Sequence, residues 1–173
     1  MDYLNEEIIG PLFDILEKCK GVKQDIVHHP EGDVFIHSLQ VLQCAMRESK
    51  DIDVILAAML HDIGKMEVRR GHEKASVGML KDHYLSGKTL WLIENHMRFW
   101  YYILGDMKKL GKAKEISEHP WASDLLQVAR WDKMGRRPGY VPKYNREDLI
   151  DRLNKIAASR YEQTPCKHQR SLV

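Results

Sequence analysis

Apolar residues along the chain recur at intervals of three and four, the spacing that places side chains on one face of an α-helix. The spacing begins with Leu4, Ile8, Leu12 and Ile15, and comparable stripes continue to about Tyr161. No stretch alternates apolar and polar residues as a half-buried β-strand does. The pattern therefore predicts an all-α protein, a helical bundle of about seven helices.

Capping residues and glycines divide the chain into these helices. Asp33 is placed to cap a helix that runs to about Arg47, and Asp51 or Asp53 opens the next, which we expect to end at Gly64. The stretch 105–115 is basic and contains glycine, and it predicts either a short helix or a loop. The remaining helices are expected at about residues 72–84, 89–104, 121–134 and 145–161.

Composition indicates a globular protein. Of the 173 residues, 43% are hydrophobic and 30% are charged, and the net charge of +2 is too small to indicate nucleic-acid binding by itself. Three separated cysteines favour a reducing compartment. The first residues lack the layout of a signal peptide, and no run approaches the roughly 18 apolar residues of a membrane span. We therefore expect one domain over residues 1–173, cytoplasmic and without a membrane, ending in a polar tail from about residue 162.

Polar residues on apolar helix faces are the candidates for chemistry. His37 shares a stripe with Val34, Val41 and Cys44, so its imidazole is expected to point inward. The alternative is a core histidine that hydrogen-bonds a backbone group.

The adjacent pair His61 and Asp62 follows the apolar run 54–60. A carboxylate beside an imidazole at a buried helix end is costly unless a positive charge neutralises it, and a divalent cation bound to both does so. The alternative is an Asp62 that pairs with a lysine. Asp132 similarly extends the apolar face of its own helix, with an ion pair to a nearby Lys or Arg as its alternative. One metal ion would explain all three positions.

Two further histidines fit this scheme. His72 opens a helix, and His96 lies on an apolar stripe. His37 and His61 are 24 residues apart, as are His72 and His96, which suits two antiparallel helices joined by a short loop with both histidines facing one space. At least some of the loop histidines, a group that includes His28 and His29, are expected to be surface residues.

The segments HHPEGDVFIHS, AAMLHDIGK, GHEKASVGML, IENHMRFW and RWDKMGRRPG resemble successive helices of the HD superfamily of metal-dependent phosphohydrolases, over about residues 27–139. HPEGDVFIH, HDIGK and GHE are especially similar to the HD domain of bacterial tRNA nucleotidyltransferases. That domain is associated with phosphodiesterase and phosphatase activity. Because 173 residues are too few for the nucleotidyltransferase domain as well, the resemblance implies a stand-alone HD domain.

The resemblance also implies the ligands of one or two divalent ions, which could be Mn, Ni, Co, Mg or Fe. The first ion would be held by His37, His61, Asp62 and Asp132. A second ion would share Asp62 as a bridge and add His72 and His96. Related domains with similar histidines bind one ion or two, so both numbers stay open.

The implied reaction is attack of a metal-activated water on phosphorus. Asp62 and Lys65 would be catalytic residues, and Lys65 and Arg136 would bind the substrate by offsetting charge on the phosphoryl oxygens. Lys65, in HDIGK, resembles the phosphate-contacting lysine of other HD hydrolases; its alternative is a solvated lysine at a helix end. The alternative for Arg136 is a solvated loop charge. The expected partner is a small phosphorylated substrate, a nucleotide or an RNA end, and the oligomeric state is open.

Two other functions fit the same ligands. The six-residue set also resembles the HD-type di-iron oxygenases, and nitrogen-rich sites suit iron. A non-catalytic regulatory module that binds a nucleotide is the third interpretation. The lysine of HDIGK and the HPEG loop favour phosphate chemistry, whereas iron in the purified protein would favour the oxygenase.

Overall fold

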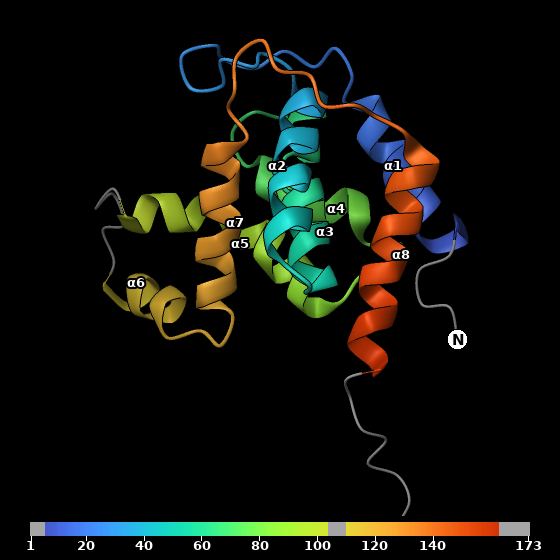
Figure 1. The fold of residues 1–173 in the computed structure, drawn as a ribbon. Helices are drawn as coiled ribbons and strands as arrows, with labels where there is room; N and C mark the ends of the chain where they lie inside the picture. The colour runs from blue at the N-terminus through green and yellow to red at the C-terminus, as the bar shows by residue number, and fades with distance from the viewer. Residues whose placement is uncertain (1–5, 104–109, 163–173) are drawn as a thin grey trace, which may run out of the picture.

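A computed structural model describes residues 6–103 and 110–162, which form eight α-helices, one short 3-10 helix and no strand (Figure 1). The all-α prediction is confirmed. Leu4 and the predicted polar tail from residue 163 onward lie outside the described residues. In order, the elements are α1 (Glu6–Lys18), α2 (Val34–Glu48), α3 (Ile52–Leu60), η1 (Ile63–Met66), α4 (His72–Leu80), α5 (Gly87–Ile103), α6 (Leu110–Ser117), α7 (Ala122–Met134) and α8 (Arg146–Glu162).

The described residues contain one helix more than the seven predicted. The additional helix is α6, in the basic stretch for which the sequence allowed either a short helix or a loop. A second difference is where the third helix ends. It stops at Leu60 rather than Gly64, and the chain turns at His61 and Asp62 before continuing as η1. Gly64 does not end this helix but allows close packing, because η1 lies so near α4 that a Cβ at Gly64 would lie 2.1 Å from the carbonyl oxygen of His72.

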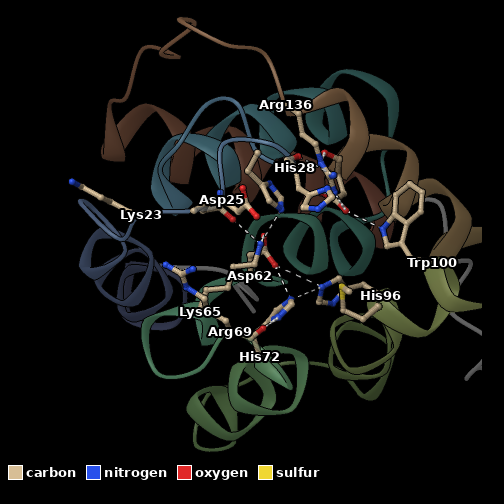
Figure 2. Close-up of a pocket in the computed structure, with 14 residues that line it drawn as sticks. Lys23, Asp25, His28, Asp62, Lys65, Arg69, His72, His96, Trp100 and Arg136 are labelled. Atoms are coloured by element: carbon tan, nitrogen blue, oxygen red, sulfur yellow. Dashed lines mark hydrogen bonds and ion pairs between the residues drawn. The ribbon is translucent and has the colours of Figure 1, made fainter.

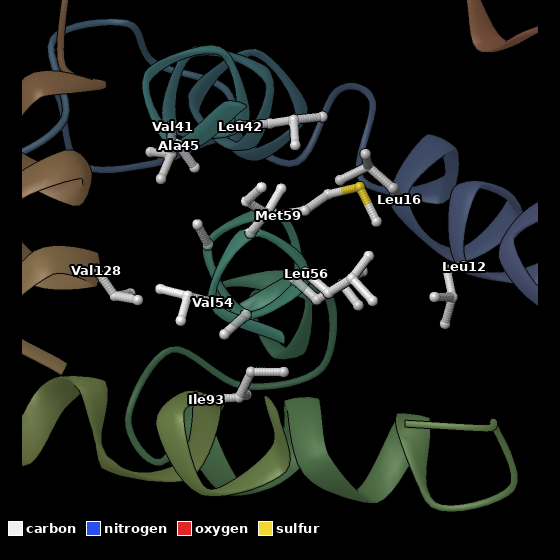
Figure 3. Packing of buried hydrophobic residues seen from close by; sticks show 14 of the residues in the cluster. Leu12, Leu16, Val41, Leu42, Ala45, Val54, Leu56, Met59, Ile93 and Val128 are labelled. Atoms are coloured by element: carbon white, nitrogen blue, oxygen red, sulfur yellow. The ribbon is translucent and has the colours of Figure 1, made fainter. Parts of the chain in front are cut away.

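The core is built around α3, whose nine residues contain eight that are buried. Figure 3 shows its apolar side chains between those of α1, α2, α5 and α7. Each large aliphatic side chain that is fully buried contributes about 1.5–3 kcal/mol relative to an exposed one. This packing fixes the end of α3, and therefore His61 and Asp62, at the centre of the molecule.

One helix cap and one buried amide fix the segments around that centre. Asp33 caps α2 as predicted, accepting a hydrogen bond from the Ile36 N–H at 3.0 Å. Gln40, on α2, donates to the carbonyls of Arg137 and Tyr140 at 3.0 and 2.8 Å and accepts from the Arg137 N–H at 2.9 Å. The loop after α7 is thereby held against α2. Among the described helices, none has the length and apolar character that crossing a bilayer requires.

Candidate metal centre

Five elements or their ends converge on one buried cluster of polar side chains. All of them are at most 5% exposed, although burial of so many ionisable groups is costly unless they satisfy one another. The members are His37 from α2, His61 and Asp62 from the turn after α3, His72 from α4, His96 from α5 and Asp132 from α7. These are the six residues that the sequence singled out, and the fold brings all of them together.

The four imidazoles share one orientation. Each places Nδ1 within hydrogen-bond distance of a backbone carbonyl, and donation from Nδ1 leaves Nε2 as the atom with a free lone pair. The distances are 3.0 Å for His37 to Gly135, 2.9 Å for His61 to Ala58, 2.8 Å for His72 to Arg69 and 2.7 Å for His96 to Ile93. The backbone thus selects the tautomer in which all four Nε2 atoms can bind a cation.

Those Nε2 atoms lack ordinary partners in the described part of the chain. The Nε2 atoms of His37 and His61 are buried without a hydrogen-bond partner, and those of His72 and His96 lie 3.1 Å from each other. Two lone pairs at that separation repel unless a proton or a metal cation stands between them. Buried imidazole nitrogens and carboxylate oxygens are suitable ligands for a divalent ion, so the residues present fit a metal.

Asp62 stands between two groups of these nitrogens, with one carboxylate oxygen toward each. Its Oδ2 lies 3.4 Å from His61 Nε2 and 3.6 Å from His37 Nε2. Its Oδ1 lies 3.1 Å from His72 Nε2 and 3.7 Å from His96 Nε2. Although burial raises the pKa of Asp62, the charges of His61 and Lys65 hold it well below its usual range. A carboxylate in this position can face two cations at once.

Asp132 completes the His37 and His61 group. Its Oδ1 is 3.1 Å from His37 Nε2 and 3.9 Å from His61 Nε2. Trp100 Nε1 donates to its Oδ2 at 3.1 Å, and Arg136 Nη2 lies 2.9 Å from both oxygens. Burial raises the pKa of Asp132, but the contact with His37 and the charges of His37, His61 and Arg136 together lower the pKa well below its usual range. The ion pair expected as the alternative for Asp132 is present, together with the histidine contacts.

Lys65 is not a solvated helix-end lysine, because its side chain is only 15% exposed. Its Nζ donates to Asp62 Oδ2 at 2.6 Å and to Gln24 Oε1 at 2.6 Å, and it lies 3.2 Å from His29 Nε2. Arg136 is also held in place, because its Nη1 donates to the carbonyl of His28 at 3.1 Å. Both cations therefore lie beside carboxylates of the cluster.

The segment between α1 and α2 supplies neighbours of the cluster that the sequence did not single out. His29 is 14% exposed at its side chain, and the side chain of Glu31 is fully buried although it belongs to a loop. Glu31 Oε1 lies 2.8 Å from His37 Nδ1 and 3.0 Å from His29 Nδ1. The signal that could have found them is the run of ionisable residues immediately before the cap Asp33.

A pocket of about 390 Å³ opens onto Asp62 and Asp132 (Figure 2). Trp100 forms part of its wall. Four cationic side chains also line it: Lys23, Lys65, Arg69 and Arg136. An anionic molecule of small size would therefore meet positive charge and the buried cluster in the same space.

Comparison with known proteins agrees with this geometry. Residues 34–138 match the HD domain family. The chain is similar to multifunctional CCA proteins: it is 40% identical over 76 residues to that of Methylococcus capsulatus, covering 40% of this chain and 18% of that protein. The protein of Thioalkalivibrio sulfidiphilus is 38% identical over 79 residues, covering 42% and 19%.

The chain thus spans about a fifth of the length of these relatives. They confirm the predicted likeness to the HD domain of tRNA nucleotidyltransferases. Since the family match covers most of the chain, from the start of α2 to the loop after α7, the chain belongs to the HD domain family, a superfamily of metal-dependent phosphohydrolases.

Proposed function

We propose that this chain is a metal-dependent phosphohydrolase, a phosphomonoesterase or phosphodiesterase that acts on a nucleotide or a related phosphate ester. The observation that supports it most strongly is the position of Asp62, whose two oxygens face histidine Nε2 atoms on both sides. The backbone carbonyls that accept from Nδ1 leave these nitrogens free to bind a cation.

The cluster offers ligands for one or two divalent ions, which could be Mn, Ni, Co, Mg or Fe. A first ion would be held by His37, His61, Asp62 and Asp132, and a second by Asp62, His72 and His96. When bound, such an ion lowers the pKa of a water molecule toward about 7 and stabilises negative charge on a phosphoryl group. Asp62 would act as the central ligand, and its removal would affect both ions.

Lys65 and Arg136 would bind the phosphate. Each contacts a carboxylate of the cluster, Asp62 in the first case and Asp132 in the second, so an anion at the cluster would lie near both cations. Fixed positive charges in a partly buried site stabilise the charge that accumulates on the phosphoryl oxygens during hydrolysis. Lys65 is also the cation that we expect to act in catalysis.

A nucleotide suits the pocket for two reasons. Its volume of about 390 Å³ falls within the usual range for small-molecule sites, and it combines cationic walls with the indole of Trp100. The relatives are named multifunctional CCA proteins, which also points to nucleotide or RNA chemistry. The proposed substrate is therefore a small phosphorylated molecule such as a nucleotide. The end of an RNA, which carries the same phosphate group on a larger molecule, is the second proposed substrate.

The test is hydrolysis of a panel of esters by metal-stripped protein supplied with Mn²⁺, Ni²⁺, Co²⁺, Mg²⁺ or Fe²⁺. The panel holds p-nitrophenyl phosphate, bis-p-nitrophenyl phosphate and nucleoside mono- and cyclic phosphates. We expect His61→Ala and Asp62→Ala to lower metal-dependent turnover at least about 100-fold, the scale seen when electrostatic groups of an active site are removed. The control is His83→Ala, outside the cluster, with turnover within about twofold of wild type. Unchanged turnover in both cluster variants would contradict the proposal.

A di-iron oxygenase is the second candidate, and the bridging position of Asp62 between nitrogen-rich groups favours it. The two functions differ in what the protein consumes. Purified protein that contains two irons, shows a mixed-valent spectroscopic signal and consumes dioxygen would support the oxygenase. Release of phosphate or alcohol from the esters without dioxygen supports the hydrolase.

A further inference from the structure

Glu31 is a buried carboxylate in the loop between α1 and α2. Its Oε1 lies 2.8 Å from His37 Nδ1 and accepts from His29 Nδ1 at 3.0 Å and from Gln24 Nε2 at 3.3 Å. The side chain of Glu31 is fully buried although it belongs to a loop, and a buried carboxylate is costly unless its neighbours satisfy it.

We propose that Glu31 is a positioning residue that holds His37 as a metal ligand and couples the loop of residues 23–33, part of which lines the pocket, to the metal centre. The inference rests on the metal centre of the proposed function and adds the residue that controls one of its ligands.

His37 differs from the other three histidines in how its ring is held. His61, His72 and His96 each have Nδ1 beside the carbonyl three residues earlier in their own segment. His37 Nδ1 instead contacts Glu31 from the preceding loop and the carbonyl of Gly135, which is 98 residues away. Its orientation therefore depends on tertiary structure. A carboxylate that accepts from Nδ1 also makes Nε2 more basic and so a stronger ligand.

The same carboxylate connects the loop to the other side of the cluster. Lys65 Nζ donates to His29 Nε2 at 3.2 Å, which leaves His29 Nδ1 to donate to Glu31. Lys65 also donates to Asp62 Oδ2 at 2.6 Å. Residues 23–33 thus reach His37 through Glu31 and Asp62 through His29 and Lys65. A change in either ligand is passed to the loop that lines the pocket.

The test measures Mn²⁺ binding to the metal-free full chain by calorimetry. We expect Glu31→Gln to lower the affinity about 10- to 100-fold, as loss of a carboxylate behind a histidine ligand does. Glu31→Asp keeps the charge on a shorter side chain, and its affinity should fall between those of Glu31→Gln and wild type.

Glu73→Gln is the matched control. Glu73 Oε2 lies 4.0 Å from His72 Nδ1, whose hydrogen bond goes to the Arg69 carbonyl. This variant therefore removes the same charge near a histidine of the cluster without removing a hydrogen bond to it. Its Mn²⁺ affinity should stay within about threefold of wild type, since a partly exposed charge is screened.

Hydrogen exchange provides a second readout. Mn²⁺ should slow exchange of the backbone amides of residues 23–33 in wild type and in Glu73→Gln, but much less in Glu31→Gln. Wild-type affinity and wild-type protection in Glu31→Gln would overturn the inference while leaving the metal centre intact. A lower melting temperature of metal-free Glu31→Gln with unchanged affinity would overturn it too, because the role would then be structural. A wild-type chain that binds no Mn²⁺ would contradict the proposed metal centre and this inference together.

Discussion

The Nε2 atoms of His72 and His96 face each other at 3.1 Å, on the side of Asp62 that carries Oδ1. Both rings place Nδ1 against a backbone carbonyl, so both Nε2 atoms would otherwise present lone pairs to each other. Burial lowers the pKa of His96, whereas Asp62 raises that of His72 in spite of burial. A cation bound by both rings would satisfy the two lone pairs.

This pair predicts the number of bound ions. Wild type should bind two Mn²⁺ per chain, and the double variant His72→Ala/His96→Ala should bind one, because His37, His61, Asp62 and Asp132 remain. Equilibrium dialysis followed by elemental analysis measures the ratio. A single ion in wild type, or two in the double variant, would show that His72 and His96 hold no separate ion.

His37 predicts how the stability of the metal-free protein depends on pH. Burial lowers its pKa, but the neighbouring carboxylates of Asp132, Glu31 and Asp62 together outweigh that effect and raise it to about 9 from 6.5. A raised folded-state pKa stabilises the fold fully below the unfolded value, and the contribution is lost as pH rises through the folded value. The free energy of unfolding should therefore fall between pH 6.5 and 9, by up to about 3 kcal/mol. Urea denaturation in the presence of a chelator measures it, and His37→Gln should flatten the slope.

The close packing around Gly64 requires a residue without a Cβ just after the turn that carries His61 and Asp62. An alanine Cβ there would lie 2.1 Å from the His72 carbonyl oxygen and 2.5 Å from the Ser76 nitrogen, so η1 and α4 would have to separate. We expect Gly64→Ala to lower the free energy of unfolding by at least about 1–3 kcal/mol and to weaken Mn²⁺ binding. Gly78→Ala, on α4 with nothing within 4 Å of the added Cβ, should be neutral or stabilising by up to about 1 kcal/mol. Equal melting temperatures for the two variants would contradict this explanation.

Replacement of Lys65 is expected to lower substrate turnover without weakening metal binding. Lys65→Met should lower kcat/KM for the phosphate ester about 10- to 100-fold, because it removes a fixed positive charge beside Asp62. The Mn²⁺ affinity should not fall, because the variant lacks the Lys65 ammonium, which competes with a metal ion for Asp62 Oδ2. Steady-state kinetics and calorimetry on the same preparations test both parts, with the exposed Lys74→Met as the control. A parallel loss of Mn²⁺ affinity would mean that Lys65 supports the ligands instead.

Helical periodicity predicted much of the fold from the sequence alone. Asp33 was predicted to cap a helix and does so, because capping depends on a backbone group only three residues away. Periodicity did not reveal that the third helix ends at Leu60. Gly64, the predicted end of that helix, instead lies where η1 packs on α4, a contact that only tertiary structure creates.

The six polar residues of the cluster were recognisable from the sequence, since each is an ionisable residue on or beside an apolar helix face. Only tertiary structure decided the directions of the histidine lone pairs and the place of Asp62 between two histidine groups. It also decided the contacts with the neighbouring side chains of Glu31, His29 and Lys65. The physical reason is the range of the interactions. Hydrophobic spacing acts within a few residues, whereas the contacts that aim His37 come from a loop and from a carbonyl 98 residues along the chain.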